Sequence, residues 1–401
     1  MSTPIITMPG KMNRCRVLVV HNAYQQKGGE DSVVESEAGL LASNGHAVER
    51  FTRHNDEIRT MPRASVALQT CWSGKSAQRI ENVIDAFRPD VIHAHNTFPL
   101  ISPSIYWAAE RAAIPVVQTL HNFRLLCPQA MFLRQGKVCE DCLGHVPWRG
   151  ALHACYRDSR AQSAVVAGML TLHRALGTYR TKVSRFIALN EFCRRKFVEG
   201  GLPADRIVVK PNFVDFPMPQ PVHRDGFLFV GRLSAEKGLT VLVSALQQLS
   251  GAVVRVAGVG PESARLEGIP GIRALGSLAG DAVRAEMSGA IALLLPSVWY
   301  ENFPLTVIEA FGCGLPVIAS RIGALADLVE EGVTGLQFET GNAQDLAAKM
   351  RWAQAHPEQM TAMGRNARAL YEGRFTPERN YQQLTAIYRD VIEEARDRRG
   401  P

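Results

Sequence analysis

The sequence of 401 residues lacks the features that mark membrane-spanning, secreted or disordered chains. No segment reaches the roughly 18 consecutive apolar residues of a membrane-spanning helix. The N-terminal stretch has no basic region followed by an apolar run, so no signal peptide is predicted. Apolar residues make up 46% and charged residues 21%, which excludes long disorder. These absences predict a cytosolic globular protein, in which the eight cysteines would be reduced, metal-bound or buried.

The net charge of +7 is unevenly distributed along the chain. Residues 1–211 carry 27 Lys and Arg against 17 Asp and Glu, whereas residues 212–401 carry 18 against 21. Residues 120–211 alone hold 15 against 6, an excess of +9. This pattern indicates an anionic partner for the first half, with a solvated basic face as the alternative.

Short apolar runs alternate with helical stretches, first from Arg16 to Asn190 and again from Phe227 to Ser320. Near-continuous apolar strands separated by helices are typical of parallel sheets covered on both faces. The length favours two or three domains. We therefore predict an α/β chain of two doubly wound, Rossmann-like domains that face a central cleft, the default place for a ligand.

A proline-rich stretch separates the two series of strands. Pro211 to Pro221 holds four prolines and cannot form regular structure. We predict an N-terminal domain over residues 1–211, a linker over 212–225 and a C-terminal domain over 226–375. Residues 376–401 are predicted to form a helix that packs back on the N-terminal domain.

Polar residues and glycines follow the predicted strands of the first half. Gly28 and Gly29 lie between the first strand and the first helix, where backbone and helix terminus can approach an anion, or where the chain merely turns. The dinucleotide fingerprint G-x-G-x-x-G is absent. His121 ends a later strand and could hydrogen-bond a substrate oxygen, or be structural. His21, His93, His95 and Asn122 lie at similar strand ends, so several polar groups are expected to converge there.

Two cations follow the first strand of the second half. Arg232 comes just after this strand and Lys237 precedes the next helix. Fixed cations beside a helix N-terminus suit a diphosphate, although surface residues near a turn would look the same. Further along, Glu301 and Glu309 lie before and within a predicted helix that begins near Pro304. Both carboxylates could accept hydrogen bonds from sugar or ribose hydroxyls, and Glu301 could instead serve the helix dipole.

These motifs together resemble the family 4 retaining glycosyltransferases of the GT-B fold, also described as glycosyl transferases group 1. The resemblance combines Gly-Gly-Glu after the first strand, Thr-x-His-Asn ending at Asn122, Gly-Arg-Leu-x-x-x-Lys-Gly and Glu-x7-Glu, in order along nearly the whole chain. Its most specific part is the segment from Pro296 to Ser320, followed by Arg321 to Gly323 and Asp327 to Gly335. Asn122 replaces the Asp often found after this His in the family.

The resemblance implies a role for each motif. Arg232 and Lys237 would hold the donor diphosphate and stabilise it as the leaving group, and Glu309 would bind the nucleotide ribose. His121 would lie close to the reacting sugar. The remaining residues would contact the donor sugar, its phosphates or the acceptor, and they are Gly28, Gly29, Glu301, Asn302, Phe303 and Pro304.

The resemblance also implies a mechanism and a setting. The family's usual reaction is front-face substitution with retention, and the absence of an Asp-x-Asp motif fits metal-independent catalysis without a cofactor. The expected substrates are a nucleotide-diphosphate sugar and a glycan or lipid-linked acceptor, in bacterial surface polysaccharide synthesis. A nucleotide-sugar epimerase and an inactive GT-B partner subunit are the alternatives, and the intact motif set argues against both.

A cysteine-rich insertion over about residues 122–158 follows His121. Its four cysteines, with spacing C-x11-C-x2-C-x12-C, suit a structural zinc site, while reduced buried thiols or a redox pair are the alternatives. The members of this set are Cys127, Cys139, Cys142 and Cys155. The insertion should lie on the acceptor side of the cleft, within the basic segment 120–211.

The basic segment 120–211 predicts a peripheral contact with an anionic membrane on its cytoplasmic face, or with a lipid-linked pyrophosphate. Apolar residues including Trp148 and Tyr156 are interleaved with its cations. Nucleic acid is the competing anionic partner, but no nucleic-acid-binding motif supports it.

Overall fold

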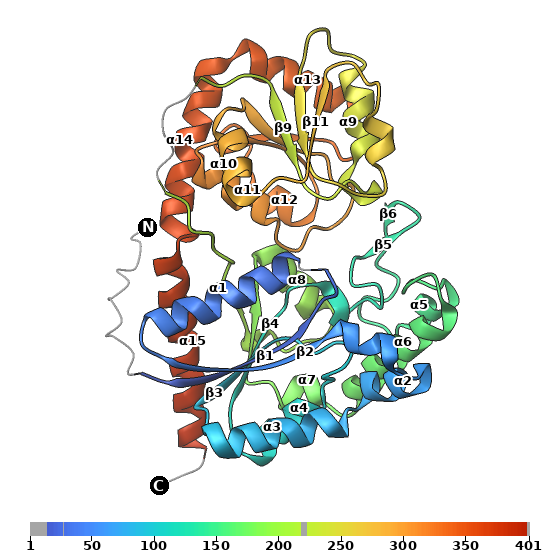
Figure 1. Ribbon diagram of the computed structural model, residues 1–401, viewed down its shortest axis with the longest axis vertical. Helices are drawn as coiled ribbons and strands as arrows, with labels where there is room; N and C mark the ends of the chain where they lie inside the picture. Colours follow the sequence, from blue (N-terminus) through green and yellow to red (C-terminus); the bar gives the residue numbers. More distant parts are fainter. Residues whose placement is uncertain (1–13, 27, 218–222, 399–401) are drawn as a thin grey trace.

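The computed structural model describes residues 14–26, 28–217 and 223–398. They form two α/β halves, each built on a six-stranded parallel sheet, as the sequence predicted (Figure 1). Residues 218–222 of the predicted linker lie outside the described residues. None of the helices in the described ranges is long and apolar enough to cross a membrane.

The sheet of the first half has the order β2-β1-β3-β4-β7-β8. Alternate residues of β1 enter different cores: Leu18 and Val20 pack toward α3 and α4, and Val17 and Val19 pack toward α1 and α15. Burial on both faces explains why this strand has no polar alternation. The strands are β1 (Arg16–Ala23), β2 (Ala47–His54), β3 (Val91–Asn96), β4 (Val116–Thr119), β7 (Arg185–Ala188) and β8 (Ile207–Val209). The helices named here are α1 (Gly29–Ser43), α3 (Gly74–Phe87), α4 (Ser104–Arg111) and α15 (Pro377–Asp397).

The sheet of the second half has the order β11-β10-β9-β12-β13-β14. Its two faces are covered by α9 and α13 on one side and by α11 and α14 on the other. The strands are β9 (Phe227–Val230), β10 (Val254–Ala257), β11 (Ile272–Gly276), β12 (Ala292–Leu295), β13 (Val317–Ser320) and β14 (Gly335–Phe338). The helices are α9 (Leu239–Leu246), α10 (Gly280–Ser288), α11 (Leu305–Gly312), α12 (Gly323–Leu328), α13 (Ala343–Ala355) and α14 (Pro357–Arg374).

The last helix, α15, crosses from the second half and lies along the first (Figure 1). Its Leu384, Tyr388 and Val391 are buried against residues of β1, β3, β4 and α1. The Tyr388 hydroxyl also lies 2.7 Å from Nδ1 of His93 on β3. The helix therefore supplies one wall of the core of the first half.

The segment that follows β4 has little regular structure. It contains the short helix η2 (Phe123–Leu125), a two-stranded hairpin of β5 (Leu133–Arg134) and β6 (Lys137–Val138), and α5 (Trp148–Leu152). The helices α6 (Arg160–Ala175) and α7 (Thr178–Thr181) then lead back to the sheet at β7, and α8 (Glu191–Glu199) follows β7. The helix α2 (Arg63–Cys71) packs on α6 from the other side.

Candidate functional site

The carboxyl ends of the central strands of both sheets carry the polar residues that the sequence singled out. In the first half, β1, β3 and β4 lead to His21, His95 and His121. In the second half, β9 leads to Arg232 and β12 leads to Glu301. This is the edge at which ligands bind in open parallel sheets.

Asn302 joins the two halves at this edge. Its Nδ2 donates to the carbonyl of Leu120 at 2.9 Å, and its own carbonyl accepts from Nδ2 of Asn190 at 2.6 Å. The thiol of Cys193 lies 2.8 Å from Oδ1 of Asn302. Because its side chain is fully used across the interface, Asn302 positions the neighbouring Glu301 and Phe303 rather than offering its own amide to a ligand.

Lys237 and Glu301 form an ion pair in the second half. Nζ of Lys237 lies 2.6 Å from Oε1 of Glu301, and the same oxygen accepts from Ser297 at 2.8 Å and from Trp299 Nε1 at 3.1 Å. Lys237 ends the short helix η4 (Ala235–Lys237). Gly238 follows it with a φ of 73°, and a Cβ at this position would lie 1.8 Å from the carbonyl oxygen of Pro296. This close approach brings Lys237 against the loop that carries Glu301.

The side chains of Arg232 and Glu309 form no ion pair in the described part of the chain. Arg232 is exposed after β9 and makes no ion pair or hydrogen bond there through its side chain. Glu309 lies within α11, where burial raises the pKa of its carboxyl. The positive charge of Arg284 lowers this pKa by a smaller amount. A guanidinium and a carboxylate left free in this way are available to a ligand.

The N-terminus of α1 faces α11 of the other half. Gly28 is the N-cap and Gly29 is the first residue of α1. A Cβ on Gly29 would lie 3.5 Å from Leu305, which begins α11. Both glycines are exposed, and the positive end of the helix dipole therefore opens toward the second half.

His121 is held by a second histidine. Nε2 of His121 lies 2.9 Å from Nδ1 of His95, and the two rings stack with their centroids 5.2 Å apart. Burial lowers the pKa of His121 to about 3, so its imidazole is neutral near pH 7. The pKa of His95 is likewise lowered by burial and by the adjacent histidines.

Glu37 lies beneath this pair, buried in α1. Its Oε1 is 2.5 Å from Nζ of the fully buried Lys210, and its Oε2 is 3.8 Å from Nε2 of His95. Burial would raise the pKa of Glu37, but the charges of Lys210 and His93 and the hydrogen bond from Lys210 hold it below its ordinary value. At 3.8 Å the carboxylate makes no hydrogen bond to His95, but its charge should favour the His95 proton on Nε2, and we expect Nδ1 of His95 to accept from His121. His121 is then left with an unprotonated Nδ1 that can accept a hydrogen bond from a hydroxyl.

Glu37, His93 and His95 also lie close enough together to suggest a metal site. Both ring nitrogens of His93 are already used, by the Tyr388 hydroxyl at 2.7 Å and by Oγ1 of Thr119 at 2.8 Å. Lys210 already neutralises Glu37. The group therefore fits a polar core network better than a bound cation.

Glu30 is a cleft residue to which the sequence assigned no role. Its Oε2 accepts from the Tyr24 hydroxyl at 3.0 Å and from Nδ2 of Asn122 at 3.3 Å, while its Oε1 is shielded from water without a partner. Burial raises the pKa of Glu30 to about 8. Its position in Gly-Gly-Glu was the only signal in the sequence, because Asn122 is 92 residues away.

The four cysteines of the insertion are free thiols that lie near one another. Burial and then the neighbouring Cys127 raise the pKa of Cys142 to about 11, and Cys155 is raised by the same causes. Their sulfur atoms do not lie close enough together to form a ready metal site. In the described ranges, the residues whose ligand atoms all lie within 4.8 Å of one another are instead Glu37, His93 and His95.

Two facing Rossmann-like halves with a site at their junction define the GT-B class of glycosyltransferases. The solved structures agree on the fold. HepE from Anabaena in complex with UDP has a TM-score of 0.67 at 19% identity, with 94% of this chain and 100% of that chain covered. A sucrose-phosphate synthase from Thermosynechococcus elongatus has a TM-score of 0.70 at 19% identity, with 95% and 100% covered.

Sequence comparison gives the family. Residues 217–370 match the family described as glycosyl transferases group 1, and residues 28–212 match the glycosyl transferase 4-like domain. A D-inositol 3-phosphate glycosyltransferase of Segniliparus rotundus is 27% identical, over 91% of this chain and 85% of its own length. The sulfoquinovosyl transferase SQD2 of Arabidopsis thaliana is 33% identical, over 77% of this chain and 59% of its own length. The chain belongs to the group 1, family 4-like glycosyltransferases.

Proposed function

We propose that this glycosyltransferase moves a sugar, with retention, from a nucleotide-diphosphate sugar to a glycan or lipid-linked acceptor. The observation that carries the proposal is the pairing of Lys237 with Glu301 beside an unpaired Arg232 at the junction of the halves. Two cations at this point suit a diphosphate that gains charge as it leaves. Structural neighbours crystallised with UDP and with UDP-glucose support this choice of donor class.

The proposed reaction has a simple balance of bonds and protons. The bond between the anomeric carbon and the diphosphate oxygen breaks, and the acceptor hydroxyl oxygen bonds the anomeric carbon from the same face. The hydroxyl proton passes to the departing diphosphate, which Arg232 and Lys237 hold. Glu309 would bind the ribose, and Nδ1 of His121 would accept a hydrogen bond from a hydroxyl of the donor sugar. No metal or cofactor is required by this scheme.

The donor proposal is tested by thermal shift against UDP-, GDP- and ADP-sugars. A ligand that binds only the folded state adds about 2.7 kcal/mol to the free energy of unfolding at one hundred times Kd, and so raises the melting temperature as its concentration rises. We expect one nucleotide class to produce this shift, and Lys237→Met to abolish it. The absence of a shift with every donor would contradict the proposal.

The stereochemical and metal aspects need separate measurements. Proton NMR of the first product should show the anomeric configuration of the donor. A chelator such as EDTA should leave the rate of sugar transfer unchanged. An inverted product, or a rate restored only by divalent cations, would overturn the corresponding part of the scheme.

The proposed setting is the cytoplasmic face of a bacterial membrane, where the protein would act peripherally in surface polysaccharide synthesis. The basic segment 120–211 and the cysteine-rich insertion that follows His121 both support an acceptor that carries a lipid phosphate. Isolation of the radiolabelled product in an organic phase tests this setting. A product found only in the aqueous phase would contradict it.

A further inference from the structure

Large apolar side chains are exposed mainly on one lobe of the first half. In the described ranges, nine such residues are exposed, and seven of them lie on or beside α2, α5 and α6. These seven are Leu68, Trp72, Val146, Trp148, Leu152, Leu172 and Leu176. Their exposed fractions range from 40% at Leu172 to 72% at Leu68. Exposed apolar residues gathered on one surface indicate a binding surface rather than chance exposure.

The fold brings these residues together from distant parts of the sequence. Trp72 at the end of α2 stacks on His173 of α6 with ring centroids 5.9 Å apart, and His173 Nε2 lies 2.8 Å from the carbonyl of Cys71. The backbone N–H of Tyr156, just after α5, donates to Oγ of Ser163 on α6 at 2.8 Å. Figure 1 shows α2, α5 and α6 side by side at the edge of the first half.

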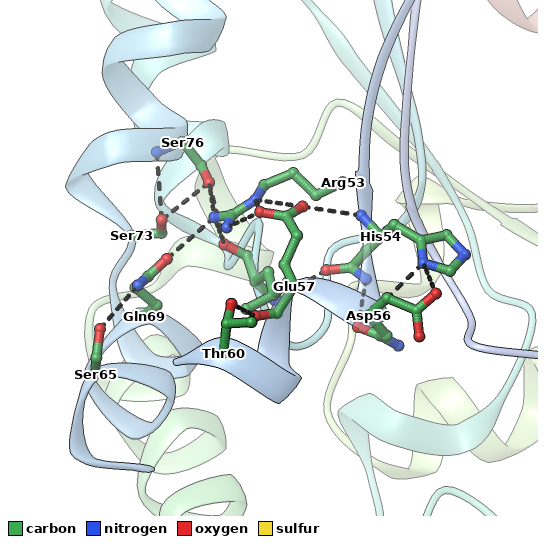
Figure 2. A network of polar contacts seen from close by, with 12 residues as sticks. Arg53, His54, Asp56, Glu57, Thr60, Ser65, Gln69, Ser73 and Ser76 are labelled. Carbon is green, nitrogen blue, oxygen red and sulfur yellow. Dashed lines mark hydrogen bonds and ion pairs between the residues drawn. The ribbon is translucent and has the colours of Figure 1, made fainter. Parts of the chain in front are cut away.

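A buried arginine fixes α2 in this position. Arg53 at the end of β2 donates to Oε1 of Gln69 on α2 at 3.0 Å and to Oγ of Ser76 on α3 at 3.3 Å (Figure 2). Its Nη2 also lies 2.6 Å from Oε2 of Glu57. These bonds connect α2 to β2 and α3 on the side that faces the protein.

The same surface carries a strong excess of positive charge. Residues 61–75 and 145–182, which supply the three helices, contain eight Lys and Arg and one acidic residue, Asp158. Arg59 just before this region is paired with Asp56 at 3.3 Å, and Lys182 is paired with Glu110 at 2.5 Å. In the described residues, Arg63, Arg157 and Arg160 pair with no carboxylate. These free cations lie among the exposed apolar side chains.

A groove of about 660 Å³ runs between α2 and α6. Its walls are largely apolar and include Ala67, Val165 and Val166, with Arg63 and Arg157 among the lining residues. Thr70 and Phe98 line both this groove and the small cavity beside His121. The groove and the cavity beside His121 therefore share part of one wall.

We infer that α2, α5 and α6 form a lipid-docking face, with the groove between α2 and α6 holding the phosphate and first apolar segment of an anionic membrane lipid. The inference deepens the lipid-linked acceptor of the proposed function and rests on it. Exposed Trp and Leu suit the interface between headgroups and acyl chains, and Arg can bind phosphate while its methylene stem lies along apolar surface. Neutral apolar partners would leave the unpaired cations unused.

Vesicle sedimentation in the absence of donor tests the face directly. The full chain should bind vesicles of phosphatidylcholine and phosphatidylglycerol at a 7:3 ratio, and bind pure phosphatidylcholine at least tenfold more weakly. The triple variant Leu68→Ser, Trp148→Ser, Leu152→Ser should lose at least tenfold in binding. The matched control is Val259→Ser with Val333→Ser, which removes the two exposed apolar residues outside the face and should bind as the unmodified protein does.

A charge variant tests the groove. Arg63→Glu with Arg157→Glu should lose binding to the anionic vesicles, whereas Arg273→Glu, at an exposed position on β11, should not. Donor-induced thermal shifts should be unchanged in all these variants, so loss of vesicle binding with intact donor binding separates this inference from the donor proposal. Equal binding to both vesicle types, equal loss in the control, or a dimer that only the triple variant breaks would overturn the inference.

Discussion

His95 and His121 share one hydrogen bond, with Nδ1 of the first 2.9 Å from Nε2 of the second, at the point where two parallel strands end. We expect the ionised Glu37, 3.8 Å from the far nitrogen of His95, to set the direction of this bond through its charge. A carboxylate in the core thus determines that His121 presents an acceptor atom to the cleft. Glu37 does not touch the sugar in this scheme; it acts on the proposed sugar contact of His121 through His95.

Replacing His95 tests this positioning. In His95→Phe the ring of His121 loses its partner, and we expect kcat to fall about tenfold, the effect of about 1.4 kcal/mol. Nitrogen-15 NMR should show His121 protonated on Nε2 in the unmodified protein and a mixture of tautomers in the variant. His46→Gln, which changes a buried histidine beside Cys15 and Tyr381, is the control and should retain kcat. An unchanged tautomer in His95→Phe would contradict the assignment.

Removing only one partner of the buried pair of Lys210 and Glu37 should strongly destabilise the protein. Both residues are buried and their charged atoms are 2.5 Å apart. Lys210→Met leaves an uncompensated carboxylate, and we expect a loss of about 3–5 kcal/mol in the free energy of unfolding. Urea denaturation measures the loss. The double variant Lys210→Met, Glu37→Leu should recover a large part of it, and a double variant as unstable as the single one would argue against a specific charge effect.

Acid should destabilise the protein through its buried histidines. Burial lowers the pKa of His93 to about 4 and of His121 to about 3, below the ordinary value of 6.5 in the unfolded chain. Between pH 6.5 and 4 the unfolded chain therefore binds more protons, so stability falls as the pH falls. Each group contributes a slope of up to about 1.4 kcal/mol per pH unit. Urea unfolding at pH 7, 6 and 5 should show this slope, and His121→Asn should reduce it.

Donor binding and chemistry should both depend on Lys237. We expect Lys237→Met to lower kcat/KM by about 10²–10³, as expected for a group that stabilises developing charge. Glu309→Gln should instead raise the donor KM with a smaller effect on kcat. Lys349→Met is a matched control, because Lys349 also forms an ion pair, with Glu331 at 2.6 Å, but lies outside the site. Steady-state kinetics with equal activity in Lys237→Met and Lys349→Met would exclude the proposed role.

The four cysteines of the insertion still suggest a structural zinc ion, which would draw the sulfur atoms closer than they lie here. We propose that protein purified under reducing conditions holds one zinc per chain by mass spectrometry of metals. Cys142→Ser should lose it and lower the melting temperature, whereas Cys313→Ser, a buried thiol in the second half, should retain it. Metal-free protein with an unchanged melting temperature would leave reduced thiols as the explanation.

The sequence predicted the two sheets because their strands are buried on both faces. Val17 to Val20 and Phe227 to Phe229 are unbroken apolar runs, and such runs leave little choice of structure. The edge strands β8 and β14 were not predicted, since β8 has only three residues and β14 has only four, one of them the polar Gln337. The ion pair of Lys210 with Glu37 spans 173 residues, and the contact of Asn302 with Leu120 spans 182. Contacts of this separation depend on the packing of whole elements, which local pattern does not encode.

The crossing of α15 makes the second half an insertion within the first. The first sheet contains residues up to Val209, yet one of its faces is completed only by Leu384, Tyr388 and Val391. During synthesis, the core of the first half cannot be completed until α15 has been made, near the end of the chain. The second half can fold before that point. Proteolytic removal of α15 would accordingly unravel the part of the chain that is made first.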